Sequence, residues 1–166
     1  MRAQAPHLFN MQSNSYYTSE FYASQCEGSL LSAKIVVPLI TQLLKPRSVV
    51  DVGCGLGAWL CAFRDCGVGT IMGLDGKHFD QSRLFIPKEC FRPTDLSEPF
   101  EVEKKFDLAV CLEVAEHLPA RSAEGFVRSL VGLAPIIVFS AAVPMQGGTN
   151  HVNEERSPMR QYAMTS

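Results

Sequence analysis

Residues 48–60, SVVDVGCGLGAWL, decide the fold of this chain of 166 residues. The first five of them, residues 48–52, are mostly apolar and β-branched, which predicts a short buried strand. Glycines at alternate positions, Gly53, Gly55 and Gly57, then predict a tight turn, and the apolar residues that follow predict a helix. A strand, a glycine turn and a helix form the first half of a βαβ unit, whose helix N-terminus points backbone N–H groups at a ligand.

The identity of that ligand is not decided by the turn alone. Gly53, Gly55 and Ala58 fit the dinucleotide pattern G-x-G-x-x-G/A, so NAD is one candidate. Two details favour another ligand. Asp51 ends the strand, where a carboxylate can face a cation, and Gly57 comes one residue earlier than the third position of the dinucleotide pattern.

The run D-x-G-x-G-x-G from Asp51 to Gly57 resembles motif I of the class I methyltransferases that use S-adenosylmethionine (SAM). SAM carries an ammonium group and a sulfonium group but no phosphate, so a carboxylate beside the turn suits it chemically. The resemblance implies that Asp51 lies near the methionine ammonium group. It also implies that the backbone at Gly53, Cys54, Gly55 and Gly57 approaches the cofactor.

A second acid supports an adenosine ligand. Residues 70–74 predict the next strand, and Asp75 ends it, roughly 20 residues beyond the glycine turn. A βαβ unit brings an acid at this distance to the ribose hydroxyls, which SAM and NAD share. Asp75 therefore does not separate the two ligands, and it could instead begin a turn of the Asp-Gly type.

A further block supports the resemblance. Residues 106–112, FDLAVCL, form a near-continuous apolar run that predicts a strand at the centre of a parallel sheet. Together with the residues after it, this run resembles the segment after the fourth strand in many small-molecule methyltransferases. The resemblance implies that Leu112 and Glu113 contact the methionine end of SAM. It places Asp95 and Leu96, after a brief strand at residues 90–92, near the adenine, although Asp95 could equally cap a turn.

Two histidines are the candidate catalytic bases, should the methyl acceptor have a proton to lose. His117 lies four residues after Glu113, so on a helical turn the two would share a face. A metal site there lacks a third ligand at suitable spacing. His151 lies in the Gly-rich loop 141–154 that follows a predicted strand at 136–140. A helix-stabilising role for His117 and a solvated loop around His151 are the alternatives.

The segments on either side of motif I have their own patterns. Residues 29–45 carry apolar side chains at helical spacing, with Ser29 as the expected cap. Pro38 should kink this helix or move its start to about Pro38. Residues 120–133 predict another helix. Before these, Tyr16, Tyr17 or Tyr22 could belong to a lid over the cofactor, or to an arm packed on the surface.

Composition excludes several function classes. The formal net charge is −2 and no Lys/Arg block occurs, so nothing favours nucleic acid or an anionic membrane as the main partner. The six cysteines form no C-x-x-C pair, which argues against zinc and is typical of a reducing, cytoplasmic compartment. The N-terminus lacks the apolar core of a signal peptide, and the longest apolar run, 134–145, is too interrupted to span a membrane.

We therefore expect an α/β doubly wound, Rossmann-like domain with a mostly parallel sheet of about five strands. The expected organisation is an arm or lid at 1–28, a SAM-binding domain at 29–154 and an irregular tail at 155–166. The tail has no strand pattern, so the C-terminal helix and antiparallel hairpin usual in the family should be absent. One sheet edge would then be uncovered, and a dimer or another partner could cover it.

The expected function is that of a SAM-dependent methyltransferase acting on a small-molecule acceptor, which could be a shortened form of a longer enzyme. Two alternatives remain open at this point. One is an NAD(P)-binding oxidoreductase domain. The other is a non-catalytic remnant that still binds SAM.

Overall fold

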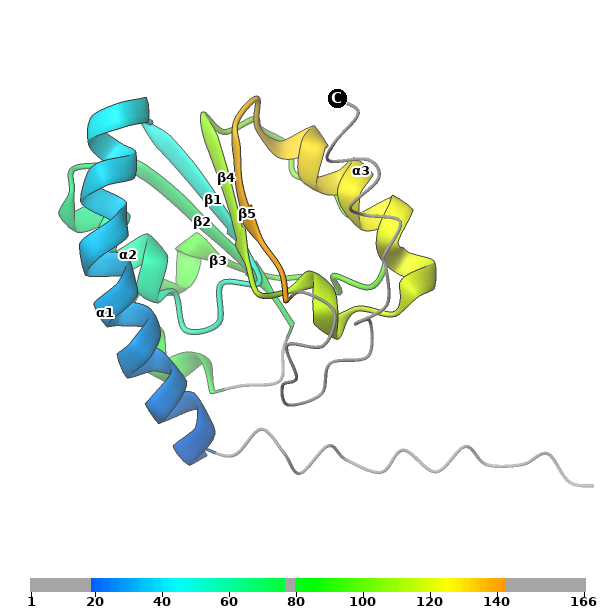
Figure 1. Cartoon of the computed structure of the whole chain (residues 1–166), viewed down its shortest axis with the longest axis horizontal. Helices are drawn as coiled ribbons and strands as arrows, with labels where there is room; N and C mark the ends of the chain where they lie inside the picture. Colours follow the sequence, from blue (N-terminus) through cyan, green and yellow to red (C-terminus); the bar gives the residue numbers. More distant parts are fainter. Residues whose placement is uncertain (1–18, 77–79, 143–166) are drawn as a thin grey trace, which may run out of the picture.

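The computed structural model describes residues 19–76 and 80–142, with side chains from residue 28 onward within these ranges. Its centre is a five-stranded sheet in the order β3-β2-β1-β4-β5, in which all pairs are parallel (Figure 1). The strands are β1 (Ser48–Val52), β2 (Thr70–Asp75), β3 (Phe91–Pro93), β4 (Leu108–Leu112) and β5 (Ile137–Ser140). This is the expected α/β fold. The strand order reverses between β1 and β4, and open sheets of this kind bind ligands beside the carboxyl ends of the strands at that point.

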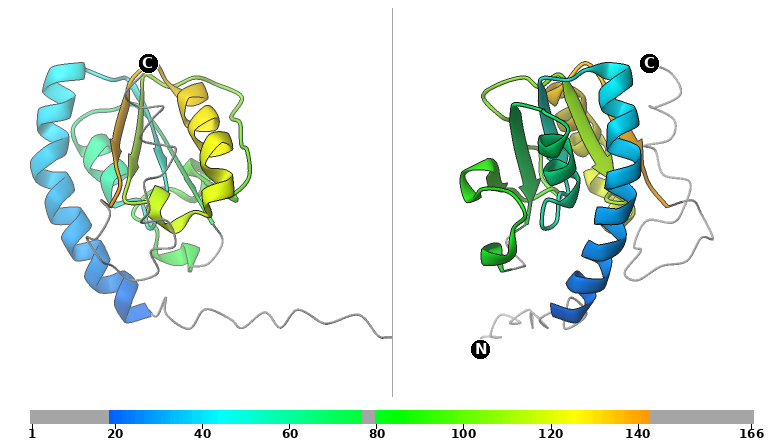
Figure 2. Two further views of the ribbon diagram at one scale, coloured as in Figure 1. Left: turned by 45° about the vertical axis from the view of Figure 1, so that its right-hand side comes forward. Right: turned by 90° about the vertical axis from the view of Figure 1, so that its left-hand side faces the viewer.

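Helices cover both faces of the sheet. The helices α1 (Ser19–Leu44) and α2 (Ala58–Asp65) lie on one side, and α3 (Ala123–Leu133) lies on the other (Figure 2, left). Each side has its own apolar core. Val49, Phe63 and Leu108 are fully buried on the α2 side, and Phe126 and Leu133 are buried on the α3 side. Because β1 alternates between these cores, four of its five residues are buried.

The helix before β1 is longer than its sequence pattern indicates. It begins at Ser19, not at Ser29, and it continues through Pro38. The expected start at Pro38 is therefore wrong. Pro38 lies on the exposed side, where its ring meets solvent, and the buried side chains of Ala33 and Val37 hold the helix against the core on the other side.

The remaining elements lie close to their predicted places. The strand at 106–112 begins two residues later, at Leu108, and the third strand is shifted by one residue. The helix expected at 120–133 begins with a 3₁₀ turn at Ala120–Ser122. Over the part of the chain that the structure describes, no helix is long and apolar enough to cross a membrane.

Candidate functional site

The glycine turn after β1 has a backbone that other residues adopt only with strain. Gly53, Gly55 and Gly57 all have positive φ angles, of 79°, 53° and 84°. A Cβ atom on Gly53 would overlap Val114, which belongs to the turn after β4. The turn therefore packs directly against the neighbouring loop at the strand order reversal. Gly57 in turn forms the N-cap of α2.

Asp75 holds the glycine turn in place. It lies at the end of β2 and is buried, and its Oδ2 accepts a hydrogen bond from the backbone N–H of Gly55 at 2.7 Å. Its Oδ1 accepts one from the N–H of Gly76 at 2.6 Å, so the Asp-Gly interaction considered as an alternative is present as well. A carboxylate has about four acceptor positions, which is more than these two backbone bonds occupy.

Asp51 is the second acid of the site, and it is 4% exposed in the fourth position of β1. Burial, reinforced by the negative charge of Asp75, raises the pKa of Asp51 to about 8. None of the ion pairs of the described residues involves Asp51. Two acids on neighbouring strands are therefore buried close enough for the charge of Asp75 to shift the pKa of Asp51. A cation beside Asp51 would favour its ionised form.

Cys54 completes this group within the turn. Its thiol is buried, and burial together with the charges of Asp51 and Asp75 keeps the pKa of Cys54 well above its ordinary value. The thiol is therefore neutral, and it packs against the backbone of Gly73 on β2, where an added Cβ would lie 2.6 Å from its Sγ.

Glu113 does not lie on a helix with His117, so the expectation of a shared helical face is wrong. Its φ angle is 56°, in the left-handed region, and the helical turn starts only at Ala115. The Glu113 N–H donates to the carbonyl of Ser140 at 3.0 Å, and the Ser140 hydroxyl donates to Glu113 Oε1 at 2.7 Å. These bonds tie the end of β4 to the end of β5 and turn the chain sharply after the strand.

Glu116 is a site residue that the sequence interpretation missed. Its side chain is only 2% exposed, and its Oε1 accepts a hydrogen bond from the backbone N–H of Ala142, just beyond β5, at 3.2 Å. Its Oε2 is buried and has no hydrogen-bond partner among the residues that the structure describes. A signal was available, because Val114 and Ala115 precede this acid and Leu118 follows it two residues later.

The other predicted residues lie around this centre. Asp95 is exposed, and its Oδ1 accepts bonds from the Ser97 hydroxyl at 2.6 Å and the Ser97 N–H at 2.9 Å. These bonds lower the pKa of Asp95 and show the turn-capping role that was the alternative. Leu96 is buried in the core on the α3 side, and Leu112 is half-buried on the α2 side. His117 is exposed.

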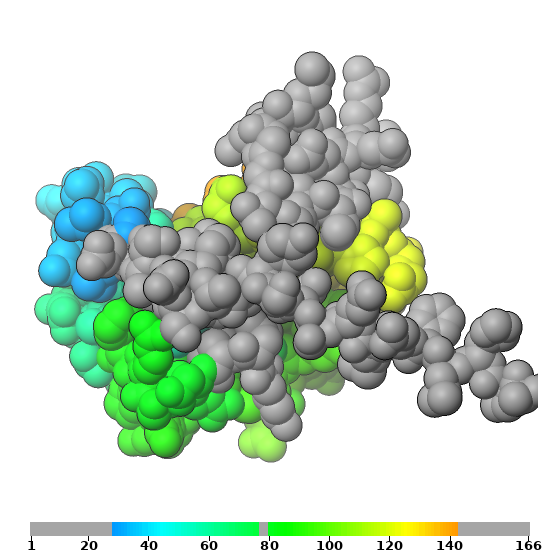
Figure 3. Space-filling model, turned by 90° about the horizontal axis from the view of Figure 1, so that it is seen from below, coloured from blue at the N-terminus to red at the C-terminus, as the bar shows by residue number. Residues whose placement is uncertain are grey.

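Several predicted features lie outside the described residues. These are His151 and the rest of the loop from residue 143 onward, the tail at 155–166, and the lid candidates Tyr16 and Tyr17, together with the side chain of Tyr22. Figure 3 views the molecule from below, with blue α1 and the green residues on one side and yellow α3 on the other. Within residues 28–76 and 80–142, no group of three His, Cys, Asp or Glu side chains could hold a metal ion.

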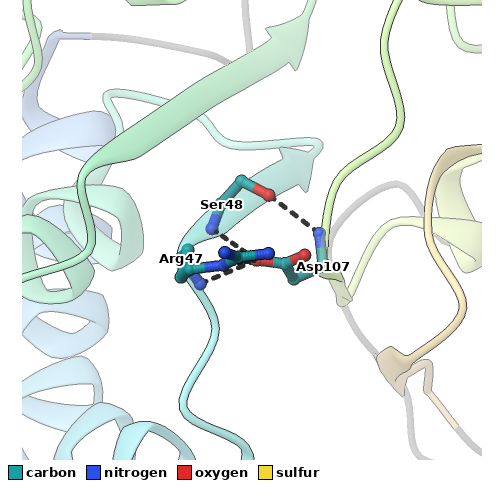
Figure 4. Close-up of polar contacts among 3 residues, drawn as sticks. All are labelled: Arg47, Ser48 and Asp107. Carbon is teal, nitrogen blue, oxygen red and sulfur yellow. Dashed lines mark hydrogen bonds and ion pairs between the residues drawn. The ribbon is translucent and has the colours of Figure 1, made fainter.

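The opposite end of the sheet carries a different acid. Asp107 precedes β4, and its Oδ2 accepts hydrogen bonds from the backbone N–H groups of Arg47 at 2.8 Å and Ser48 at 3.1 Å (Figure 4). Its own N–H donates to the Ser48 hydroxyl at 2.9 Å. The bond from the Arg47 N–H is the main reason why the pKa of Asp107 is lowered. This carboxylate fastens the start of β4 to the start of β1.

Comparison with known proteins gives a family and a fold. Residues 14–131 match the model of the family described as Methyltransferase domain. No curated protein matches the chain in sequence.

Solved structures resemble the chain at low sequence identity. The sugar N-methyltransferase KedS8 from Streptoalloteichus sp. ATCC 53650 aligns with a TM-score of 0.63 and 14% identity, over 90% of this chain and 62% of KedS8. DesVI of Streptomyces venezuelae aligns with a TM-score of 0.60 and 19% identity, over 78% of this chain and 58% of DesVI. CalS10 of Micromonospora echinaspora, an amino pentose methyltransferase solved with SAM bound, aligns with a TM-score of 0.50 and 22% identity, over 70% of this chain and 53% of CalS10. The chain therefore spans less than two thirds of each of these proteins.

Proposed function

The chain belongs to the methyltransferase-domain family, and from this premise we propose that it binds SAM at the glycine turn and transfers the methyl group to a small molecule. One observation carries the proposal: Asp51 and Asp75 are buried on neighbouring strands beside a turn in which the N–H groups of Gly53, Cys54, Gly55 and Gly57 already donate within the chain. Because those N–H groups are already used, the turn offers few donors to the pyrophosphate of NAD, which disfavours the oxidoreductase alternative.

The residues of the site have separate roles in this proposal. Asp51 attracts the ammonium group of the methionine part of SAM. Asp75 accepts hydrogen bonds from the ribose hydroxyls. Asp95 and Leu96 lie on the adenine side. Leu112 and Glu113 lie on the methionine side. The glycines and Cys54 let the ligand approach the backbone.

The chemistry needs little from side chains beyond position. When bound, SAM would supply an activated methyl group: a lone pair of the acceptor would form the new bond to the methyl carbon while the methyl–sulfur bond breaks and leaves its electron pair on sulfur. The protein's main contribution is to hold the acceptor in line with that bond. An acceptor that carries a proton must pass it to a base, and His117 or His151 is proposed for that step.

The acceptor is proposed to be a small molecule with an amino or hydroxyl group. KedS8 and CalS10, two structures of similar fold, are methyltransferases of a sugar and of an amino pentose, which supports this class.

The five cysteines that the structure describes are free, in keeping with a cytoplasmic setting. A partner at the sheet edge is also proposed, because Phe139 on the edge strand β5 is 43% exposed.

Titration calorimetry with SAM, S-adenosylhomocysteine (SAH) and NAD tests the proposal. We expect binding of SAM and SAH and no binding of NAD, and the reverse result would eliminate the methyltransferase function. A transfer assay with methyl-labelled SAM and a panel of amines and sugars then separates an active enzyme from a remnant that binds the cofactor without turnover.

A further inference from the structure

Glu113 has a backbone conformation that its residue type does not favour. Its φ of 56° lies in the left-handed region, where a side chain costs free energy and glycine or asparagine is usual. Lys45, with a φ of 48°, is the only other non-glycine residue with a positive φ in the part of the chain that the structure describes. Lys45 has a local reason, because its N–H donates to the Thr41 carbonyl and ends α1. Glu113 follows a strand and ends no helix, so its strain needs another explanation.

The contacts of Glu113 with the edge strand fix the direction of its side chain. Ser140, the last residue of β5, accepts the Glu113 N–H on its carbonyl oxygen, and its hydroxyl donates to Glu113 Oε1. The two strands already pair in register, with Leu112 opposite Ser140, and the backbone bond continues that pairing. The hydroxyl bond is therefore not needed to align the strands. What it adds is a carboxylate held in one orientation.

This carboxylate is open to a ligand. Glu113 is exposed, and it lies at the carboxyl end of β4, where the strand order reverses and ligands bind in sheets of this kind. No ion pair of the described residues includes it, and residues 106–120 contain no Lys or Arg. A fixed negative charge without a cation of its own suits a ligand that brings a cation or N–H donors.

We propose that Glu113 binds the methyl acceptor, that its carboxylate selects acceptors with an amino group over those with a hydroxyl group, and that Ser140 is its positioning residue. This inference rests on the proposed methyl transfer from SAM. In that proposal Leu112 and Glu113 lie on the methionine side of the cofactor. The methyl group is bound to sulfur between the methionine part and the ribose, so an acceptor in line with that bond comes to the same end of the sheet.

The chemistry of an amine explains why a carboxylate suits it. An amine that arrives as an ammonium ion is attracted by Glu113 and gives one proton to the base proposed for the reaction. The nitrogen lone pair then forms the bond to the methyl carbon, while the methyl–sulfur bond breaks and leaves its electron pair on sulfur. Positive charge thus moves from sulfur to nitrogen, and the product leaves as a methylammonium ion. An N–H of the acceptor donates to Glu113 throughout, and this bond strengthens as the charge on nitrogen grows.

Matched acceptors test the selectivity. The full chain is given methyl-labelled SAM and pairs of compounds that differ only in an amino or a hydroxyl group, such as glucosamine with glucose, and primary amines with their alcohols. We expect kcat/KM to be at least about tenfold higher for the amines, because they keep a charged donor for the carboxylate in the transition state. Glu113→Gln should lower kcat/KM for the amines by about 10–100-fold and remove most of this preference.

Two substitutions at Ser140 test its positioning role. Ser140→Ala removes the donor to Glu113 Oε1, so kcat for the amines should fall by about 3–10-fold with little change in KM. Ser140→Thr keeps the hydroxyl and should restore most of kcat. A role in strand pairing alone would leave kcat unchanged in both variants.

A stability measurement tests the strain without any acceptor or cofactor. Glu113→Gly relieves the left-handed strain, so the ligand-free variant should melt at or above the temperature of the unaltered chain and lose transfer to amines. Lys45→Gly is the matched control, because it relieves similar strain at an exposed residue before the amino end of β1. It should change the melting temperature in the same direction and leave transfer unchanged.

The outcomes separate this inference from the proposed function. A chain that binds neither SAM nor SAH would overturn the proposed function, and the inference with it. A chain that binds SAM but methylates none of the amines, or that keeps its amine preference with Glu113→Gln, would overturn the inference alone. A melting temperature lowered by more than about 5 °C in Glu113→Gly but not in Lys45→Gly would overturn it as well, because Glu113 would then serve the fold.

Discussion

Two acids at opposite ends of the same pair of strands have opposite environments. Asp107, just before β4, is partly exposed and receives backbone N–H groups from Arg47 and Ser48, which lower its pKa. Asp51, near the end of the adjacent β1, is buried, and burial together with the charge of Asp75 raises its pKa to about 8. The chain supplies the partners of Asp107 from its own backbone, whereas burial at Asp51 disfavours the charged form of the acid.

That difference separates an acid that builds the fold from an acid that we propose binds a ligand. Asp107 precedes β4 and Asp51 lies within β1, so both belong to the same pair of strands. Only the environment distinguishes them. Strongly shifted ionisable groups gather at functional sites, and a buried acid with a raised pKa at a strand order reversal fits that rule.

The largest expected effect comes from a substitution in the glycine turn after β1, at the carboxyl ends of the strands. Gly53→Ala adds a Cβ at a φ of 79° that also overlaps Val114, so we expect about 2–4 kcal/mol of lost stability and no measurable SAH binding. Gly67→Ala is the matched control, because Gly67 has a φ of 89° with open space around it, and should cost about 1–2 kcal/mol. Denaturant unfolding measures both.

The overlap itself can be isolated in a double variant. Val114→Ala removes the methyl groups that the new Cβ would meet, so Gly53→Ala with Val114→Ala should be more stable than the two single effects predict. Additive effects would mean that backbone strain alone explains the loss.

Matched amide substitutions at the two ends sharpen the comparison. Asp75→Asn replaces one carboxylate oxygen with an N–H donor, although both oxygens now accept backbone N–H groups, so we expect SAH affinity to fall by about 10–100-fold. Asp107→Asn keeps one oxygen for the N–H groups of Arg47 and Ser48, which both reach the same Oδ2, and should leave SAH affinity unchanged. Equal losses in both variants would remove the functional distinction.

The raised pKa of Asp51 gives the third prediction. The folded-state pKa of about 8 lies above the ordinary value of 3.8, so the folded protein binds the extra proton between these values. Stability of the ligand-free protein should therefore be greatest below about pH 4 as far as Asp51 is concerned, and this contribution should be lost as pH rises towards about 8. Asp51→Asn should flatten that part of the stability profile in chemical denaturation.

The ionisation of Asp51 should also make SAM affinity depend on pH, with a sign opposite to that of the stability. A cation beside Asp51 favours the ionised carboxylate, so SAM affinity should increase as pH rises towards about 8 and should level off there. Asp51→Asn should bind SAM more weakly and lose this dependence. A variant that retains the pH dependence would show that another group carries it.

The sequence predicted the strands well because their apolar runs are short, buried and bounded by glycine, proline or acidic residues. β1, β2 and β5 agree with their predicted ranges to within one residue. The start of α1 was missed because residues 19–28 lack a regular apolar stripe, and Pro38 gave a local signal for an end that packing at Val37 overrides.

The acids of the site were predictable only where a strand end placed them. Asp51 and Asp75 follow from the strands and the turn, whereas the left-handed backbone of Glu113 depends on its bonds to Ser140 on another strand. The burial of Glu116 likewise depends on the chain leaving β5. Neither contact has a counterpart in the local sequence pattern, because both join residues more than twenty positions apart.

Substitution of Glu116, near the carboxyl ends of β4 and β5, should have the smallest effect on stability and the most local one. Glu116→Ala removes the acceptor for the Ala142 N–H but also removes an unpaired buried oxygen, so the two effects offset and stability should change by about 1 kcal/mol or less. The local effect should be clearer, since hydrogen exchange at the Ala142 amide should become faster. Glu116→Gln keeps an oxygen for that bond and should leave the exchange rate close to that of the unaltered chain. If both variants exchange alike, the contact does not hold the chain after β5, and Glu116 would resemble Asp51 in awaiting a partner.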